Sequence, residues 1–242
     1  MNSSELQTTN SNLSHLAVIM DGNRRWAKTQ SMNVSEGHRA GVTALQNLVK
    51  LCPDYGIEYL TAYAFSTENW KRSPIEREFI FKLLEEVSIK ELSRLHDNNV
   101  RVKFIGDLRI FQHSSLYQAL IQLEDKTKNN TGLKLQIALN YGSLDELAHA
   151  IKEIREDTDE DKIQDLDPEK FSDYLYTRDI PDPELLIRTG GDHRLSNYLL
   201  WQSVNAKLAF TDVFWPDFSK QDLESLLSSY KQSTQAKEPV RA

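Results

Sequence analysis

The chain alternates between short apolar runs and longer segments with helically spaced apolar residues, and this alternation restricts the folds that it can adopt. The apolar runs have the composition of buried strands, and turn residues such as Asp-Gly end several of them. The predicted strands are 15–20, 57–65, 100–105, 133–139, 185–187 and 208–210. The predicted helices are 36–54, 75–97, 114–128, 144–154 and 221–230. The pattern predicts one α/β domain built on a mainly parallel sheet with helices on both faces.

Composition excludes several classes of protein. The 242 residues can bury a sizeable core without disulfides, and a single cysteine, Cys52, permits neither an internal disulfide nor a cysteine-based zinc cluster. The net charge of −7 argues against nucleic acid as a partner, because broad nucleic-acid binding needs a basic surface. No apolar run approaches the roughly 20 residues of a membrane span, and the first residues do not resemble a signal peptide. We expect a cytoplasmic protein.

The ends of the chain differ in composition from its middle. Residues 1–14 are rich in Ser, Asn and Thr and predict a disordered lead-in. Residues 15–230 carry all the predicted strands and helices, without a composition break suited to a domain boundary. We therefore expect a single α/β domain over 15–230 and a flexible tail over 231–242.

Polar, arginine-rich segments follow three of the predicted strands, over 21–26, 66–72 and 188–196. In open α/β sheets, ligands bind beyond the carboxyl ends of the strands, so these segments are expected to meet at one edge. Their cations are Arg24, Arg25, Arg72, Arg188 and Arg194. Guanidinium groups match phosphate oxygens, and glycine turns let backbone N–H groups approach an anion. Together they predict a phosphate-binding site.

Asp21 is a carboxylate among these arginines, and it suits Mg²⁺, which usually takes one or two carboxylates together with substrate phosphates. The alternative interpretation is that Asp21-Gly22 is only a turn and the arginines are surface charges. The sequence has neither the glycine–lysine pattern of a P-loop nor the Gly-x-Gly-x-x-Gly pattern of a dinucleotide site.

Four segments resemble the cis-prenyltransferase family, whose best-known members are undecaprenyl diphosphate synthases. They are 15–27 (HLAVIMDGNRRWA), 37–41 (GHRAG), 62–70 (AYAFSTENW) and 186–202 (LIRTGGDHRLSNYLLWQ), and the similarity extends over about 15–230. The resemblance implies a six-stranded, mostly parallel sheet flanked by helices, and usually a homodimer. It also implies a Mg²⁺-dependent transferase that condenses isopentenyl diphosphate successively onto an allylic diphosphate, such as farnesyl diphosphate, to make a cis-polyprenyl diphosphate.

The resemblance assigns a role to each matching position. Asp21 would hold Mg²⁺ and act in catalysis, and Asn69 would serve in proton removal. The substrate-binding residues would be Gly22, Asn23, Arg24, Arg25, Trp26, His38, Ser66, Thr67, Glu68, Trp70, Arg72, Arg188, Arg194, Leu195 and Ser196. The last four belong to the segment that would bind isopentenyl diphosphate. His38 could instead be an ordinary histidine near the start of a helix.

Several positions depart from the family pattern. Arg24 replaces a common glycine, Val34 replaces an arginine of the allylic site, and Lys207 replaces a glutamate of the magnesium site. The end of the chain lacks the family's Arg-x-Gly element. If Lys207 projects into the site, an unusually high Mg²⁺ requirement is expected. The alternative is that Lys207 points to solvent at the start of a strand.

These departures leave a second hypothesis open. It is a catalytically weak subunit that binds polyprenyl diphosphate or supports an active partner in a hetero-oligomer. The growing hydrocarbon needs shelter, and the helix over 75–97, with Phe81 and Ile89 off its main apolar stripe, could form a tunnel wall beside strand 133–139. Core packing explains the same pattern. Transient membrane contact would allow product release.

Overall fold

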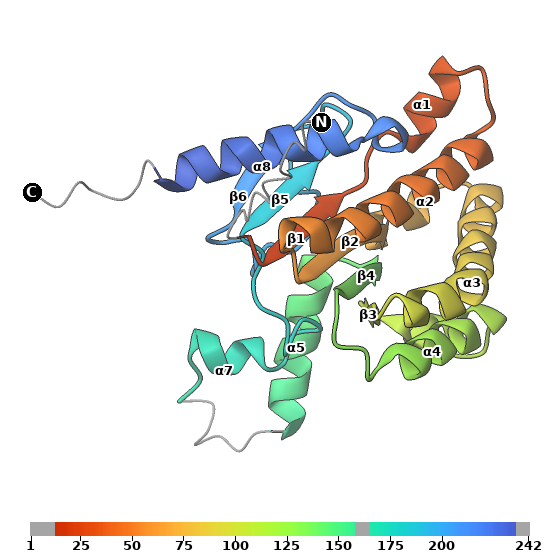
Figure 1. The fold of residues 1–242 in the computed structure, drawn as a ribbon. Helices are drawn as coiled ribbons and strands as arrows, with labels where there is room; N and C mark the ends of the chain where they lie inside the picture. The colour runs from red at the N-terminus through yellow and green to blue at the C-terminus, as the bar shows by residue number, and fades with distance from the viewer. Residues whose placement is uncertain (1–12, 158–164, 236–242) are drawn as a thin grey trace, which may run out of the picture.

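The computed structural model describes residues 13–157 and 165–235 and shows a six-stranded, all-parallel sheet flanked by helices (Figure 1). The strand order is β3-β4-β2-β1-β5-β6, so β1 lies inside the sheet between β2 and β5. The strands are β1 (His15–Ile19), β2 (Tyr59–Ser66), β3 (Arg101–Ile105), β4 (Lys134–Tyr141), β5 (Leu185–Arg188) and β6 (Lys207–Phe210). The predicted fold class is confirmed.

The helices are α1 (Asn23–Thr29), α2 (Val34–Leu51), α3 (Pro74–Asp97), α4 (Ser115–Thr127), α5 (Ser143–Asp157), α7 (Pro168–Ser172) and α8 (Lys220–Gln235). Helices α2, α3, α4, α5 and α8 occupy the predicted places with small shifts at their ends. Short 3₁₀ turns cover Cys52–Tyr55, Thr67–Lys71, Leu108–Phe111 and Trp215–Asp217. Helix α1 was not predicted, because its seven residues contain two arginines and no repeating apolar pattern.

The structure revises the two ends of the predicted domain. Helix α8 continues to Gln235, so residues 231–235 are helical rather than part of a flexible tail. Residues 236–242 and 1–12 lie outside the described part of the chain. Leu13, assigned to the lead-in from its polar neighbours, is 1% exposed and packs into the core.

Alternate strand residues feed two hydrophobic clusters, as expected for a parallel sheet that is buried on both faces. The larger cluster packs the sheet against α2, α3, α4 and α8, through residues such as Leu48, Ile80, Leu120 and Leu227. The smaller cluster lies on the opposite face and includes Tyr141, Tyr198 and Leu199. In Figure 1, α5 and α7 lie together, apart from α2, α3 and α4.

A buried polar chain crosses three strands at the amino-terminal half of the sheet. His15 Nδ1 lies 2.6 Å from the Pro181 carbonyl oxygen, and Nε2 lies 2.8 Å from Thr61 Oγ1. With the Gln136 amide nitrogen donating to Thr61 Oγ1 (3.1 Å), the Thr61 hydroxyl donates to Nε2. This arrangement uses the neutral imidazole with its proton on Nδ1. Burial lowers the pKa of His15 to about 4.

This lowered pKa predicts a loss of stability in acid. The unfolded chain takes up a proton near the ordinary pKa of 6.5, whereas the folded chain does so only near 4, so the free energy of unfolding falls as the pH drops through that window. The loss from His15 is at most about 3 kcal/mol. Urea unfolding at pH 7 and pH 4.5 should show a smaller pH effect in His15→Gln than in the wild type. His113→Gln, which changes an exposed histidine, should behave like the wild type, and an equal pH effect in His15→Gln would contradict the assignment.

Candidate active site

The carboxyl ends of β1 and β5 lie side by side, and the chain leaves them in opposite directions. Strand β1 leads through α1 and α2 to β2, whereas β5 leads to β6 on the other side of the sheet. Ligands of open α/β sheets bind in the crevice at such a switch point. Asp21 follows β1 and Arg188 ends β5, so both side chains are placed at this crevice by the pairing of the two strands.

Asp21 and Asp192 hold the arginines of the crevice. Arg188 NH2 lies 2.8 Å from Asp21 Oδ2 and 3.2 Å from Asp192 Oδ2. Asp21 Oδ1 lies 3.1 Å from Arg25 NH2, and Asp192 Oδ2 lies 2.9 Å from Arg194 NH2. The Arg188 side chain is only 4% exposed, whereas those of Arg25 and Arg194 are 46% and 63% exposed. Arg188 is therefore fixed, and the other two arginines can reach a ligand.

Glu76 contacts two arginines and a histidine across the cavity. Its Oε1 lies 3.3 Å from His38 Nε2, 3.2 Å from Arg72 NH1 and 3.9 Å from Arg24 Nε. Burial lowers the pKa of His38 below its ordinary value, and burial likewise lowers the pKa of Arg72. His38 is thus a neutral donor near pH 7 rather than a cation. The contact with Glu76 shows that His38 lines the site rather than only a helix start.

Two glycine turns bring backbone close to these side chains. Gly22 has φ +112° and would place a Cβ 2.8 Å from the Phe214 ring. Gly190 has φ +86°, and a Cβ there would lie 2.8 Å from Arg25 NH2 and 3.0 Å from the Asp21 carbonyl oxygen. Both positive φ values favour glycine, and both turns flank the crevice.

Most of the predicted site residues line one polar cavity of about 1010 Å³. They are Asp21, Gly22, Asn23, Arg24, Arg25, His38, Ser66, Glu68, Asn69, Arg72, Arg188, Arg194 and Ser196. Asn69 is held by the backbone: its Oδ1 accepts a hydrogen bond from the Ser66 N–H at 3.1 Å. The predicted convergence of three segments at one sheet edge is thus found in the structure.

Four predicted residues do not line this cavity. Trp26 donates its indole N–H to Asp217, and Thr67 donates its hydroxyl to Asp145. Trp70 donates to Asn140 and packs against aromatic rings, and Leu195 packs against the smaller hydrophobic cluster. These side chains support the walls of the site.

Other residues of the site were missed from the sequence. Lys28, Tyr63 and Asp192 line the cavity, and Glu76 joins three of its polar side chains. Lys28 lies one turn along the unpredicted helix α1. Ser73 and Glu76 have the spacing of a helix start, which marks the beginning of α3 but gives no sign of a contact with His38 or Arg72.

Val34 and Lys207, two of the departures from the family pattern, differ in their position relative to the polar cavity. Val34 is 36% exposed and lines the cavity, so the position contributes no cation there. Lys207 begins β6, at the amino-terminal edge of the sheet, and its Nζ lies 2.6 Å from Ser233 Oγ and 2.8 Å from Thr234 Oγ1. Lys207 thus lies at the start of a strand, as the alternative expected, but its ammonium group contacts α8 instead of pointing only to solvent. It does not line the polar cavity of its own chain, so the expected high Mg²⁺ requirement loses its basis.

Asp21 is the carboxylate best placed to hold a metal ion. Its side chain is 29% exposed and lines the polar cavity. Within residues 13–157 and 165–235, no three His, Cys, Asp or Glu side chains cluster as a complete metal site. One carboxylate in an arginine-lined cavity nevertheless fits Mg²⁺, because this ion usually takes one or two carboxylates and completes its ligands with phosphate oxygens and water.

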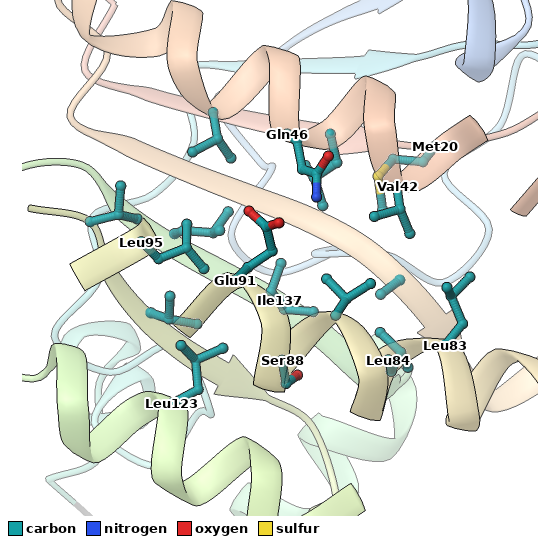
Figure 2. Close-up of a pocket in the computed structure, with 18 of the residues that line it drawn as sticks. Met20, Val42, Gln46, Leu83, Leu84, Ser88, Glu91, Leu95, Leu123 and Ile137 are labelled. Atoms are coloured by element: carbon teal, nitrogen blue, oxygen red, sulfur yellow. The ribbon is translucent and has the colours of Figure 1, made fainter. Parts of the chain in front are cut away.

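An apolar cavity of about 320 Å³ adjoins the polar one, between α2, α3 and the sheet. Met20, Asn23, His38, Ala64 and Ile80 line both cavities. Figure 2 shows Leu83, Leu84, Val42 and Met20 around this space. The residues predicted as extra tunnel wall lie elsewhere, since Phe81 packs on Phe65 and Ile89 is 59% exposed. Strand β4 contributes Leu135 and Ile137, as expected.

Comparison with known proteins identifies the family. The family model described as "Putative undecaprenyl diphosphate synthase" matches residues 19–237. The chain belongs to this family. An isoprenyl transferase of Clostridium perfringens is 45% identical to this prenyltransferase over 219 residues, which cover 90% of this chain and 86% of the relative. One of Helicobacter pylori is 44% identical over 222 residues, covering 91% and 94%.

Solved structures agree with this assignment. Lavandulyl diphosphate synthase from Lavandula x intermedia, in complex with dimethylallyl diphosphate, has a TM-score of 0.85 and 32% identity, covering 91% of this chain and 96% of that one. A probable undecaprenyl diphosphate synthase from Campylobacter jejuni has a TM-score of 0.75 and 34% identity, covering 90% and 95%. The predicted family and its prenyl-condensing activity are confirmed.

The geometry at Gly190 predicts how the anion site can be weakened. In Gly190→Ala, the added methyl group should displace the Arg25 guanidinium and reduce the affinity for inorganic pyrophosphate about tenfold or more, measured by calorimetry. Gly191→Ala is a matched control, because Gly191 also has positive φ (+81°) but its Cβ would meet Asp212 instead. Both variants should lose about 1–3 kcal/mol of stability. Equal pyrophosphate affinities in the two variants would contradict the proposed anion site.

Proposed function

We propose that this prenyltransferase adds isopentenyl diphosphate repeatedly to an allylic diphosphate, such as farnesyl diphosphate, and forms a cis double bond at each addition. The continuity of the two cavities carries this proposal. The polar cavity offers arginines to a diphosphate, and the apolar cavity behind it offers shelter to a hydrocarbon. Substrates with a charged head and an apolar chain match both parts at once.

The allylic diphosphate is assigned to the α1 side of the polar cavity. Gly22 and Asn23 lead into α1, and Arg24 and Arg25 follow on the same helix. As the allylic carbon–oxygen bond breaks, the diphosphate leaves with the electron pair and its negative charge grows. Arginines that already face this position stabilise that charge. Asn23 and His38 line both cavities, and we therefore assign the reacting carbon to the junction of the cavities.

Isopentenyl diphosphate is assigned to the β5 side of the polar cavity. Arg188 NH1 donates to Ser196 Oγ at 2.7 Å, and this contact holds Ser196 beside the exposed Arg194. The alkene of this second substrate forms the new carbon–carbon bond with the allylic carbon. A proton is then lost from the adjacent carbon, which completes the cis double bond. Holding the two substrates in this orientation supplies a large part of the rate enhancement.

Asn69 is assigned to the proton-removal step as a positioning group. An amide is a poor base, and the backbone contact from Ser66 fixes the orientation of the Asn69 side chain. The departing diphosphate is the stronger base nearby and accepts the proton. Asn69 then orients the substrate atoms between which the proton moves.

Asp21 would hold Mg²⁺ on a substrate diphosphate, and the bound ion supplies positive charge to the leaving group. Asp21 already contacts Arg25 and Arg188. Its carboxylate therefore also fixes the spacing of two diphosphate-binding cations.

Substitution of Asp21 tests the proposed reaction. We expect Asp21→Asn to reduce incorporation of labelled isopentenyl diphosphate onto farnesyl diphosphate at least 100-fold, because the variant keeps the shape of the side chain but loses its charge. Far-UV circular dichroism should remain that of the wild type. Asp54→Asn, on an exposed turn, is the control and should retain full activity. A wild-type protein that binds both diphosphates without condensing them would instead support the catalytically weak subunit.

We also propose that a second copy of this chain covers an apolar patch formed by Leu144, Leu200 and Val204. These side chains are 63%, 37% and 76% exposed. Hydrogen bonds from Leu144 N to Asn197 Oδ1 and from Leu200 N to Ser143 Oγ bring their segments together. The nearby β6 is an edge strand, on which Leu208 is 46% exposed, and such an edge favours pairing with another chain.

The oligomeric state tests this patch. Val204→Asp should convert a wild-type dimer into monomers in sedimentation equilibrium, because the charge would be buried without a partner. Ile110→Asp places the same charge at a side chain that is 57% exposed elsewhere, and it should remain dimeric. A monomeric wild type would contradict the homodimer and favour a partner of a different sequence.

The location of the reaction in the cell is inferred from the solubility of its substrates and product. Both are water-soluble diphosphates, whereas the product carries a long hydrocarbon. We place the reaction in the cytoplasm, with transient membrane contact at product release. Among the described helices, none is both long and apolar enough to cross a membrane.

A further inference from the structure

Helix α3 forms one long wall of the apolar cavity, with one or two residues in each turn facing it. Ile80, Leu84 and Val87 face the cavity in the turns nearest the polar site. Glu91 occupies the next turn on the same face. Because a helix rises 1.5 Å per residue, Glu91 lies about 16 Å along α3 from Ile80. An apolar wall is thus interrupted by a carboxylate well inside the cavity.

The Glu91 carboxylate points into the space between α2 and α3, where the Gln46 amide points into the same space from α2 (Figure 2). The Glu91 side chain is 17% exposed, and its Oε2 lies 3.0 Å from Arg94 NH1. Arg94, at 41% exposure, also lines the cavity, on the next turn. The ion pair therefore keeps contact with water through Arg94 while Glu91 faces the cavity.

Beyond Glu91 the lining is mixed, because Lys50, Arg94 and Asn98 line it together with apolar side chains. Leu95 and Val100 lie further along the chain, and Leu123 and Leu135 enclose this distal part from α4 and β4. Glu91 and Gln46 therefore form a polar constriction between a largely apolar proximal part and a mixed distal part of one cavity. Covering the Glu91–Arg94 pair and the Gln46 amide with hydrocarbon would remove water from charged and polar groups and return no hydrogen bond.

We propose that Glu91, with Gln46 opposite, stops the growing prenyl chain and so limits the length of the product. The proximal part of the cavity, from Ile80 to Glu91, shelters the chain. The distal part, behind the constriction, stays unused although Leu95, Val100, Leu123 and Leu135 line it. This inference rests on the proposed function in one respect, that the occupant of the cavity is a prenyl chain.

Binding of allylic diphosphates of increasing length tests the constriction without turnover. The probes are geranyl, farnesyl and geranylgeranyl diphosphate and their longer homologues, measured by calorimetry. In the wild type, affinity should rise about tenfold or more per five-carbon unit until the chain reaches Glu91, and then level off. Glu91→Leu should move this plateau to chains that are longer by at least one five-carbon unit. Glu78→Leu is the matched control, since Glu78 also pairs with a cation on α3 but is 68% exposed.

Product analysis gives a second readout. With farnesyl and isopentenyl diphosphate, Glu91→Leu should make products longer by one or more five-carbon units, at a total incorporation within a few-fold of the wild type. Should Glu91→Leu fail to fold, Glu91→Gln keeps the shape and removes the charge, and the plateau should move in the same direction. An unchanged plateau in the folded variants overturns the constriction.

The outcomes for the inference and for the proposed function are distinguishable. A wild type that binds the series but makes no product contradicts the proposed reaction, while the position of the plateau still decides the role of Glu91. A wild type that binds none of the diphosphates overturns both. Normal synthesis with the same product lengths in Glu91→Leu overturns the constriction alone.

Discussion

Strand β1 pairs in parallel with β2 on one side and with β5 on the other, and the active site depends on this double pairing. The register that sets Ile19 beside Arg188 brings the residues after β1 to the end of β5. Asp21 and Arg188 then form an ion pair although they are far apart in the sequence. Since all strands are parallel, every loop at their carboxyl ends lies at the same edge, and the arginines of three segments can converge there.

The charges of the site are balanced before any substrate is present. Asp21 and Asp192 hold the arginines on the β5 side, and Glu76 holds His38 and Arg72 on the α3 side. A concentration of cations would repel itself in a folded chain, so internal carboxylates make the site compatible with stability. A diphosphate entering the cavity exchanges these contacts for its own oxygens. This local arrangement explains how a chain with a net charge of −7 can bind anionic substrates.

In the proposed function, the apolar cavity shelters the hydrocarbon chain from water. Its walls come from α2, α3 and the sheet, the same elements that form the larger hydrophobic cluster. Core and cavity thus share side chains. A polar residue in such a wall therefore lowers the stability of the fold. Glu91 keeps its cation and some solvent contact, which makes the charge tolerable at that position. Position and charge together are the basis for its role as a barrier.

The sequence by itself determined the order of strands and helices, because buried strands and amphipathic helices leave periodic apolar patterns in the chain. It also determined which polar segments follow the strands, and the resemblance of 15–27 and 186–202 to a known family supplied roles for individual residues. Helix α1 escaped prediction because its turns lack an apolar stripe, and Leu13 did so because its neighbours are polar. Only the tertiary structure decided that Trp26, Thr67, Trp70 and Leu195 support the site from outside the polar cavity. Only the tertiary structure, too, joined Glu76 to His38 and set Gln46 opposite Glu91, because contacts between elements distant in sequence depend on strand order and helix packing, which local patterns do not encode.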